Sequence, residues 1–540
     1  MEIHKLLVAN RGEIAVRIFT TCERLGIQSV AVAAPDDTGA LHTRRAGETA
    51  EISSYLDPDD HVRAARESGA DAIHPGYGFL AENPGFADAV AAAGLIWIGP
   101  PARIIRAAGD KLEAKRIAAE AGVPVLPEGA ATEVGFPLIV KAAGGGGGRG
   151  MRIVRAEEDL EEALAAARRE ATAAFGDDRV FCERYAERPR HVEVQLLADA
   201  HGTVVHLGER DCSVQRRHQK VLEESPSPGV EPDVRAALGD AALAFARAVG
   251  YQGAGTAEFM LEDDGSFWFL ELNARIQVEH PVTELVTGVD LVQEQLRIAQ
   301  GEALRVTDCY LEGHAVEVRL YAEDPKTFLP QSGRVERLRL PSGIRVDVGV
   351  EEGDEVGTSY DPLIAKLIAR GPTREDALDR LAAALDETEV DGVVTNLPFL
   401  RWLVAHPALR AGRTTTAFLT DHPPLSAPPL RVPEGPWAGT FRLNLPPPPP
   451  MPPPDPEVAS DSRTRSVGEQ SSLKAPMPGT VIRVLVGNGD AVKQRQPLVV
   501  LEAMKMETPV VSPYEAVVRA VHVSEGDRVA GGELLVELEE

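Results

Sequence analysis

The chain has 540 residues, which is too many for one ordinary hydrophobic core and predicts about three or four domains. Its formal net charge of −27 argues against nucleic acid as a bulk partner, because phosphate binding needs a basic surface. No apolar run approaches the roughly 18 residues that cross a bilayer, and the start, MEIHKLLVANRGEIAVRI, lacks the layout of a signal peptide. We therefore expect no membrane contact. Since the four cysteines lie far apart without metal-ligand spacing, we also expect a reducing cytoplasm.

The first part of the chain, over about one hundred residues, alternates apolar strands with helical patterns. HKLLVAN, IQSVAVAA and LIWIG are predicted strands, and EIAVRIFTTCERLG between the first two is a predicted helix. This alternation predicts an open α/β layer.

A glycine-rich loop follows a short apolar strand in FPLIVKAAGGGGGRGM, residues 136–151. The strand ends on Lys141 and runs into five consecutive glycines, Gly144 to Gly148. Glycines let backbone N–H groups approach a phosphate closely, and a lysine at the strand end can reach the same phosphate. The loop is not a Walker A motif, because no Gly-Lys-Ser/Thr opens a helix. We favour phosphate binding over a plain flexible loop, because the run follows a strand inside a domain.

Basic residues gather in the segment ERDCSVQRRHQKVLEE, residues 209–224, of this acidic chain. The cluster consists of Arg210, Arg216, Arg217, His218 and Lys220. Alone it fits a solvated surface loop. Because the segment described next predicts a metal site that would bind phosphate as well, we favour an anion-binding role for the cluster.

The segment FWFLELNARIQVEHP, residues 267–281, combines a buried strand with alternating polar residues. If the extended conformation persists, the alternating polar side chains share one face, whereas a solvated edge strand is the alternative. Carboxylates with an amide oxygen suit Mg²⁺, and Glu258 on a nearby apolar strand completes such a site. The five alternating residues are Glu271, Asn273, Arg275, Gln277 and Glu279.

A proline-rich stretch divides the chain at residues 423–456, where eight of the nine residues from Pro446 to Pro454 are proline. Proline cannot supply strand or helix hydrogen bonds and favours extended polyproline geometry. We interpret the stretch as a linker rather than a peptide ligand, because strongly patterned sequence lies on both sides.

An internal repeat follows the linker. Residues 475–502 match the segment beginning at Ser512 at a constant offset of 37, with short alternating strands and Gly-Asp turns. This predicts a small β sandwich or flattened barrel of two similar halves. Lys505, in EAMKMETP, lies between the halves at a predicted hairpin tip. Simple solvation of Lys505 does not explain the two methionines that flank it.

These motifs closely resemble a known family. Lys141 with AAGGGGGRGM, RDCSVQRRHQK and ELNARIQVEHPVTE resemble the ATP-grasp core of biotin carboxylases, and APMPGTV with EAMKME resembles a biotin carboxyl carrier domain. Together they resemble the biotin-containing α subunit of an acyl-CoA carboxylase. The resemblance implies an open α/β N-terminal domain (1–112), an ATP-grasp α+β domain with a Gly-rich lid (113–310), a biotin carboxylase C-terminal domain (311–425), a Pro-rich linker (426–471) and an all-β biotinyl domain (472–540).

The resemblance also implies a two-step reaction. ATP and bicarbonate give carboxyphosphate, whose CO₂ unit passes to N1 of biotin on Lys505, and a carboxyltransferase β subunit on a separate chain then moves it to an acyl-CoA. A biotin protein ligase attaches the biotin, and a homo-oligomer is expected because such biotin carboxylases are often dimers. No carboxyltransferase-like segment is present in this sequence.

By motif match, the ATP-binding residues are Lys111, Lys141, Gly144, Gly145, Gly146, Gly147, Gly148, Met151, Glu183, His191, Gln215 and His218. The ligands of two Mg²⁺ or Mn²⁺ ions are Glu258, Glu271 and Asn273. Bicarbonate is bound by Lys220, Arg275, Gln277, Val278 and Glu279. The catalytic residues are the base Glu279 with Arg275, Lys220 and Arg345, the last stabilising charge on the biotin enolate.

Two departures from the family stand out. Only about 45 residues, rich in proline, replace the β-rich docking domain that usually lies between carboxylase and carrier. Ala516 stands where its repeat partner is Gly479 and the family usually has glycine; if that turn needs a positive φ, alanine costs about 1 kcal/mol.

Two alternative functions stay open. The first is the front half of a split pyruvate- or urea-type carboxylase. The second is an ATP-grasp ligase joined to a lipoyl-type carrier, which the Met-Lys-Met sequence disfavours.

Overall fold

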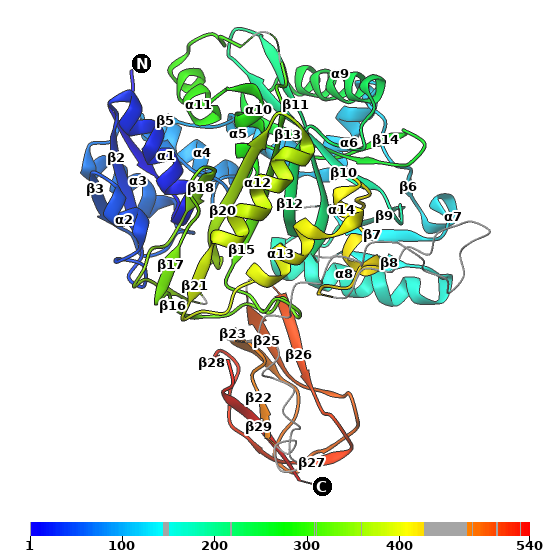
Figure 1. Cartoon of the computed structure of the whole chain (residues 1–540). Coiled ribbons are helices and arrows are strands. Elements are labelled where there is room, and N and C mark those ends of the chain that lie inside the picture. The colour runs from blue at the N-terminus through cyan, green and yellow to red at the C-terminus, as the bar shows by residue number, and fades with distance from the viewer. Residues whose placement is uncertain are drawn as a thin grey trace, which may run out of the picture.

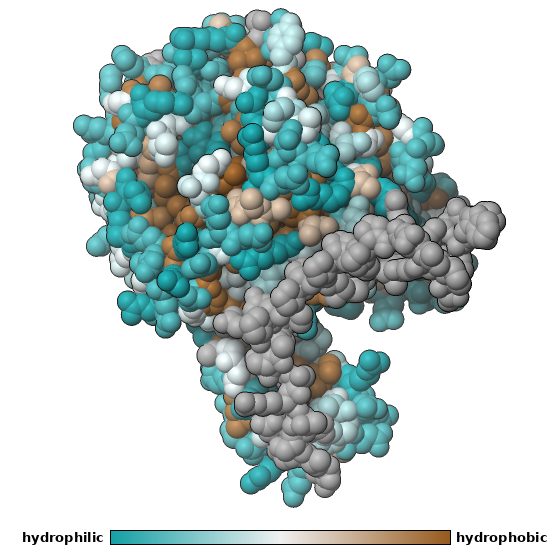
Figure 2. Space-filling model, in the orientation of Figure 1, coloured by the Kyte–Doolittle hydropathy of each residue, from teal (hydrophilic) through white to brown (hydrophobic). Residues whose placement is uncertain are grey.

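The computed structural model shows a large α/β body followed by a small β module (Figure 1). Hydrophilic residues dominate the face drawn in Figure 2, and hydrophobic residues show between them in smaller groups. Within the described part of the chain, no helix is both long enough and apolar enough to cross a membrane. The structure describes residues 2–143, 151–216, 219–306, 308, 310–357, 359–425, 472–477, 479–503, 506–529 and 531–539.

The first domain is built on a five-stranded parallel sheet in the order β3-β2-β1-β4-β5, which confirms the predicted open α/β layer. Its central strand is apolar because both faces are covered, and Leu6, Leu7 and Val8 are fully buried. Helix α1 ends at Leu25, and Gly26 follows as its C-cap residue with a left-handed φ of 72°. The elements are β1 (Lys5–Val8), α1 (Gly12–Leu25), β2 (Gln28–Ala33), α2 (Leu41–Arg45), β3 (Glu48–Glu51), α3 (Pro58–Ser68), β4 (Ala72–His74), α4 (Pro84–Ala92), β5 (Ile96–Trp97) and α5 (Ala102–Gly109).

A four-stranded antiparallel sheet in the order β6-β9-β7-β8 comes next, with α8 packed on it. The predicted strand before the glycine run is β7, and it brings Lys141 to its end. The elements are α6 (Lys111–Glu120), β6 (Glu128–Gly129), α7 (Ala131–Val134), β7 (Leu138–Ala142), β8 (Arg152–Val154), η1 (Glu157–Asp159), α8 (Leu160–Phe175) and β9 (Val180–Arg184).

The centre of the body is one eight-stranded antiparallel sheet in the order β14-β13-β10-β11-β12-β15-β20-β18. β12 pairs with β15, so the sheet runs across position 310, where the sequence predicts a domain boundary. The elements of its first part are β10 (Arg190–Ala198), β11 (Val204–Arg216), β12 (Gln219–Ser225), α9 (Pro232–Val249), β13 (Gly253–Leu261), β14 (Phe267–Asn273), α10 (His280–Thr287) and α11 (Leu291–Gln300).

Helices cover the two faces of the second part of this sheet. Ala315 and Ile368 pack against α10, whereas their strand neighbours Val316 and Leu367 pack into the core that contains α12. The elements of this part are β15 (His314–Tyr321), β16 (Gly333–Arg334), β17 (Arg337–Arg339), β18 (Arg345–Val348), β19 (Glu355–Val356), β20 (Leu363–Gly371), α12 (Arg374–Glu387), β21 (Glu389–Asp391), α13 (Leu397–Ala405), α14 (Pro407–Arg410) and α15 (Phe418–Asp421).

The extended conformation predicted through residue 279 ends at Asn273, where β14 stops. The chain then turns, and α10 begins at His280 with Glu279 as its N-cap residue. The condition under which alternation would place all five polar side chains on one face is therefore not met. A loop, and not a continued strand, directs the last three of them.

The small module confirms the predicted two-halved β fold. Its two four-stranded sheets, β22-β29-β27-β24 and β26-β25-β23-β28, each take strands from both halves. β23, β24 and β25 recur 37 residues later as β27, β28 and β29. The elements are β22 (Ser472–Lys474), β23 (Gly479–Val484), β24 (Ala491–Val492), β25 (Pro497–Ala503), β26 (Met506–Val511), β27 (Ala516–Val521), β28 (Arg528–Val529) and β29 (Leu534–Glu539).

The repeat extends to strand register. The pairing of Val500 with Pro509 in β25 and β26 recurs as the pairing of Ser472 with Glu537 in β22 and β29. β25 and β26 pair as far as Ala503 and Met506, so only two residues connect them. Those two, Met504 and Lys505, lie outside the described residues.

Ala516 carries no backbone strain. It begins β27 in an extended conformation, and the described non-glycine residues with positive φ are Phe79, Phe328, Leu425 and Arg495. The condition for the expected cost of about 1 kcal/mol is therefore not met.

We expect Ala516→Gly to weaken the module, because glycine inside a strand costs about 0.5–1 kcal/mol relative to alanine. Hydrogen exchange of the β27 and β29 amides in the full chain should become faster. Ala520→Gly, in the same strand, is the matched control and should show a similar loss. Slower exchange in Ala516→Gly would mean that position 516 needs a conformation that alanine resists.

Candidate active site

The ammonium group of Lys220, on β12, lies among three buried carboxylates. Its Nζ is 2.5 Å from Glu279 Oε1 and 3.4 Å from Glu258 Oε1, and it also donates to Glu193. β10 and β13 supply Glu193 and Glu258, which are directly paired, and the start of α10 supplies Glu279. The register of the large sheet thus brings together residues that lie far apart in the sequence.

This grouping shifts the ionisation of its members. Burial opposes a charged Lys220, but Glu193, Glu258 and Glu279 outweigh it and raise the Lys220 pKa well above its ordinary value. Burial also opposes ionisation of Glu279, yet Lys220 and then Arg319 hold the pKa of Glu279 well below its usual range. Glu279 is therefore an ionised carboxylate that is 1% exposed.

Glu279 is held from a second side as well. Its Oε2 accepts a hydrogen bond from Arg319 on β15 at 3.0 Å. As the N-cap residue of α10, Glu279 also lies at the positive end of the helix dipole. Both interactions favour the charged form, which is the form able to accept a proton.

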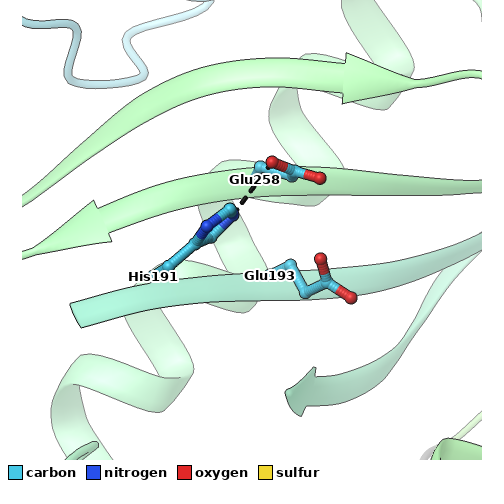
Figure 3. A group of neighbouring side chains, drawn as sticks. All are labelled: His191, Glu193 and Glu258. Carbon is cyan, nitrogen blue, oxygen red and sulfur yellow. Dashed lines mark hydrogen bonds and ion pairs between the residues drawn. The ribbon is translucent and has the colours of Figure 1, made fainter. Parts of the chain in front are cut away.

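Figure 3 shows His191 and Glu193 on one strand and Glu258 on its neighbour. His191 Nε2 lies 2.9 Å from Glu258 Oε2, and Gln215 Nε2 lies 2.5 Å from His191 Nδ1. The three labelled residues could together hold a metal ion. In this structure Lys220 supplies their positive charge instead, because it contacts both glutamates.

The predicted metal ligands lie together on β13 and on β14, the edge strand of the eight-stranded sheet. Glu258 and Glu271 are paired across β13 and β14, and Asn273 Nδ2 donates to Glu258 Oε1 at 2.7 Å. Lys111 Nζ lies 3.2 Å from Glu271 Oε2. Two neighbouring carboxylates and an amide are hard oxygen donors, so this donor set fits Mg²⁺ or Mn²⁺.

The loop after β14 presents Arg275 and Gln277 to the same centre. Arg275 donates to Glu82 from the first domain at 3.0 Å, to Gln277 Oε1 at 2.8 Å and to Asn273 Oδ1 at 2.9 Å. Gln277 Nε2 donates to Glu258 Oε1 at 3.3 Å. The loop therefore places a guanidinium and an amide beside the carboxylates, and Glu82 anchors it to the first domain.

Two lysines share one buried carboxylate at the end of β7. Lys141 and Lys115 both contact Glu183, which is fully buried, and Lys115 Nζ also lies 3.2 Å from Glu128. Burial, followed by repulsion from Lys115 and Lys111, lowers the pKa of Lys141 to about 7. Such a group gains its charge readily when an anion such as phosphate binds.

Arg345, on β18, belongs to a neighbouring cluster. It donates to Asp347 at 2.9 Å and to Glu284 at 2.6 Å. Lys366 links this cluster to the centre, because its Nζ donates to the carbonyl of Val278 at 2.9 Å and lies 3.6 Å from Asp347. Arg345 is thus connected through two residues, Asp347 and Lys366, to the loop that carries Val278 and Glu279.

The remaining predicted site residues are Met151 and seven that the structure does not describe. Met151 is half-buried immediately before β8. The predicted residues Gly144, Gly145, Gly146, Gly147, Gly148, His218 and Lys505 lie outside the described residues.

Four residues of the centre are not indicated by the sequence motifs: Lys115, Glu193, Arg319 and Glu82. Glu193 and Arg319 stand in apolar strands, HVEVQLLA and HAVEVRLY, and a charged residue in such a strand signals a buried pair. Nothing local marks Lys115 or Glu82, because their partners come from distant segments.

Family comparisons match almost the whole chain. Residues 2–105 match the biotin carboxylase N-terminal domain, 110–307 the carbamoyl-phosphate synthase L chain ATP-binding domain, 317–421 the biotin carboxylase C-terminal domain, and 471–538 the biotin-requiring enzyme family.

Individual proteins agree with these matches. The chain is 38% identical to the mitochondrial methylcrotonoyl-CoA carboxylase subunit alpha of Dictyostelium discoideum, over 96% of this chain and 93% of that one. It is 45% identical to the propionyl-CoA carboxylase alpha chain of Ruegeria pomeroyi, over 80% and 70%. Among solved structures it resembles the biotin carboxylase domain dimer of Hydrogenobacter thermophilus 2-oxoglutarate carboxylase, in complex with MgADP, ADP and bicarbonate. That match has 44% identity and a TM-score of 0.77, over 78% of this chain and 98% of that one.

We expect Lys220→Met to destabilise the body by about 3–5 kcal/mol at neutral pH, because three buried carboxylates lose their shared cation. The folded-state pKa of at least one carboxylate then rises, so the loss should shrink as the pH falls toward about 5 and that group binds a proton. Thermal unfolding of both proteins between these pH values measures the effect. Lys220→Arg, which keeps the charge, is the control. A loss that does not vary with pH would contradict this explanation.

Proposed function

Because the chain belongs to the family of biotin-containing acyl-CoA carboxylase α subunits, we propose that its body carboxylates a biotin carried on its own Lys505. The body is a biotin carboxylase, an ATP-dependent ligase, and the module at residues 471–538 is a biotin carrier domain. The observation that supports the assignment of roles is the ionised Glu279 held between Lys220 and Arg319.

Glu279 is the base of the first step. It takes the proton of bicarbonate, and the resulting oxygen nucleophile attacks the γ-phosphate of ATP to give carboxyphosphate and ADP. Lys220, Arg275, Gln277 and Val278 bind bicarbonate. Lys220 and the Arg275 guanidinium supply positive charge where negative charge accumulates, in a site that the protein has already organised.

The ATP phosphates are bound by Lys111 and Lys141 together with the glycine run at 144–148. Glu258, Glu271 and Asn273 hold Mg²⁺ or Mn²⁺, which would neutralise phosphate charge. The other residues proposed to line the nucleotide site are Met151, Glu183, His191, Gln215 and His218. The pairing of Lys141 with Glu183 and of Lys111 with Glu271 supports this site, because both lysines are held where carboxylates and phosphate can share them.

Carboxyphosphate breaks down to CO₂ and phosphate, and biotin would supply the N1 atom that receives the CO₂ unit, with the N1 proton passing to the phosphate. Arg345 binds negative charge on biotin during this transfer, and its two carboxylate partners keep the guanidinium in position. A carboxyltransferase β subunit then transfers CO₂ to an acyl-CoA. The relatives are named for methylcrotonoyl-CoA and propionyl-CoA, and these together with acetyl-CoA are the proposed substrates.

We also propose that a biotin protein ligase modifies Lys505, that the body forms homo-oligomers and that the chain works in the cytoplasm. The Hydrogenobacter thermophilus domain is described as a dimer. The Dictyostelium discoideum relative is named as mitochondrial, so fractionation of the native host tests the location.

A second candidate function is carboxylation of a 2-oxo acid. The structural similarity to the domain from 2-oxoglutarate carboxylase favours it, since that domain covers the same body. Assays of the purified complex with pyruvate, 2-oxoglutarate and the acyl-CoA substrates distinguish the two.

We expect Glu279→Gln to keep ATP binding but to lower bicarbonate-dependent ATP cleavage by roughly 10²–10⁴-fold, because the amide cannot accept the proton. Steady-state ATP cleavage with and without bicarbonate measures this. Glu294→Gln, a buried carboxylate paired with Arg297 on α11, is the control. Normal cleavage in Glu279→Gln would remove Glu279 from its role.

We expect peptide mass spectrometry of the chain from its own host to find biotin on Lys505. Lys505→Arg should keep the carboxylation of free biotin and abolish acyl-CoA carboxylation, whereas Lys493→Arg, an exposed lysine of the same module, should keep both. A lipoyl group on Lys505, or survival of acyl-CoA carboxylation in Lys505→Arg, would overturn the assignment.

A further inference from the structure

Two buried glutamates, Glu223 and Glu317, face each other on neighbouring strands of the large sheet, near Glu279. They are paired residues on the antiparallel strands β12 and β15, and both are fully buried. Side chains at paired positions lie close together, with Cβ atoms about 4.5–5.5 Å apart. Neither residue has a role in the proposed reaction.

The pair has too little positive charge around it for two ionised carboxylates. Among the described residues, no hydrogen bond reaches either oxygen of Glu317, whereas Glu223 has Arg319 as its close partner. Arg319 makes an ion pair with Glu223 but also holds Glu279. Lys366 is the cation that acts most strongly on Glu317. Its ammonium group is shared with other carboxylates, because it lies 3.2 Å from Glu13 and 3.6 Å from Asp347.

The cations around the pair are all shared with other carboxylates. Lys220 contacts Glu279, Glu258 and Glu193, so little of its charge is left for Glu223. The charged and titratable groups that act on the pair are Lys220 from β12, Cys212 from β11, Glu279 at the start of α10, Arg319 from β15, Asp347 from β18 and Lys366 from β20.

Burying a second unpaired carboxylate here is strongly unfavourable, so the protonated form is the more stable one. Burial is the main cause that raises the pKa of Glu317 well above its ordinary value, with repulsion from Glu223 added. Burial likewise raises the pKa of Glu223 to about 7, although Arg319 opposes the shift. A protonated carboxyl can donate a hydrogen bond to its ionised neighbour.

We propose that Glu223 and Glu317 hold one proton between them in the working enzyme, and that this pair positions Arg319 against Glu279. With one negative charge, the pair leaves Arg319 able to share its charge with Glu279. With two negative charges, the pair would draw Arg319 away from Glu279 and weaken the hydrogen bond that holds this base. The positioning role rests on the proposed function of Glu279, whereas the shared proton does not.

The first test detects the proton itself. Infrared spectra of the full chain at pH 7 should contain a protonated-carboxyl band that is absent from Glu317→Gln. Because the folded chain keeps a proton that the unfolded chain releases, the wild type should lose stability as the pH rises above about 4.3. Glu317→Gln should therefore have a higher Tm than the wild type at pH 8 and no advantage near pH 5. An unchanged band, or a lower Tm at pH 8, would overturn the shared proton.

The second test concerns positioning. In the wild type, kcat/KM for bicarbonate in ATP cleavage should fall at alkaline pH as the pair loses its proton, and in Glu317→Gln this fall should disappear. Glu224→Gln, at a buried neighbouring position of β12 that pairs with His314 and Arg374, is the matched control and should keep the wild-type fall. An alkaline fall that persists in Glu317→Gln would overturn the positioning role. If the wild type shows no bicarbonate-dependent cleavage, the proposed function fails, and the spectra still decide on the proton.

Discussion

The body depends on one electrostatic constraint: an ammonium group and several carboxylates must share a buried centre. Lys220 is the cation common to Glu193, Glu258 and Glu279, and it offsets the cost of burying all three as charged groups. The constraint is met by strand pairing and not by neighbours in sequence. The large sheet therefore has two functions, since it forms the core and sets the distances between charges.

The continuous sheet joins the two parts of the body on either side of position 310. Arg319 and Lys366 come from strands beyond that position, yet Arg319 holds Glu279 and Lys366 holds the carbonyl of Val278. Separation would leave Glu279 with only part of its positive surroundings. The match of distinct family domains to residues 110–307 and 317–421 thus describes units that share one sheet.

Local pattern was sufficient for much of the architecture. The α/β alternation predicted the first sheet, and the offset of 37 residues predicted the carrier down to its strands, because both signals repeat along the chain. The site was harder. Sequence motifs gathered Lys220, Glu258 and Glu279, but the turn after Asn273 and the partners Arg319 and Lys115 depend on tertiary pairing, which a one-dimensional pattern does not contain. Alternation was therefore a poor guide where the strand ended.

The matched register of the carrier has a topological consequence. β22 and β29 occupy, in one sheet, the places that the β25–β26 hairpin occupies in the other, so the module is close to a circular permutation of itself. Whereas β25 is followed along the chain by its partner β26, the corresponding strands β29 and β22 are the last and the first strands of the module. The end of the module where β25 and β26 meet is thus opposite the end where Ser472 begins β22 (Figure 1).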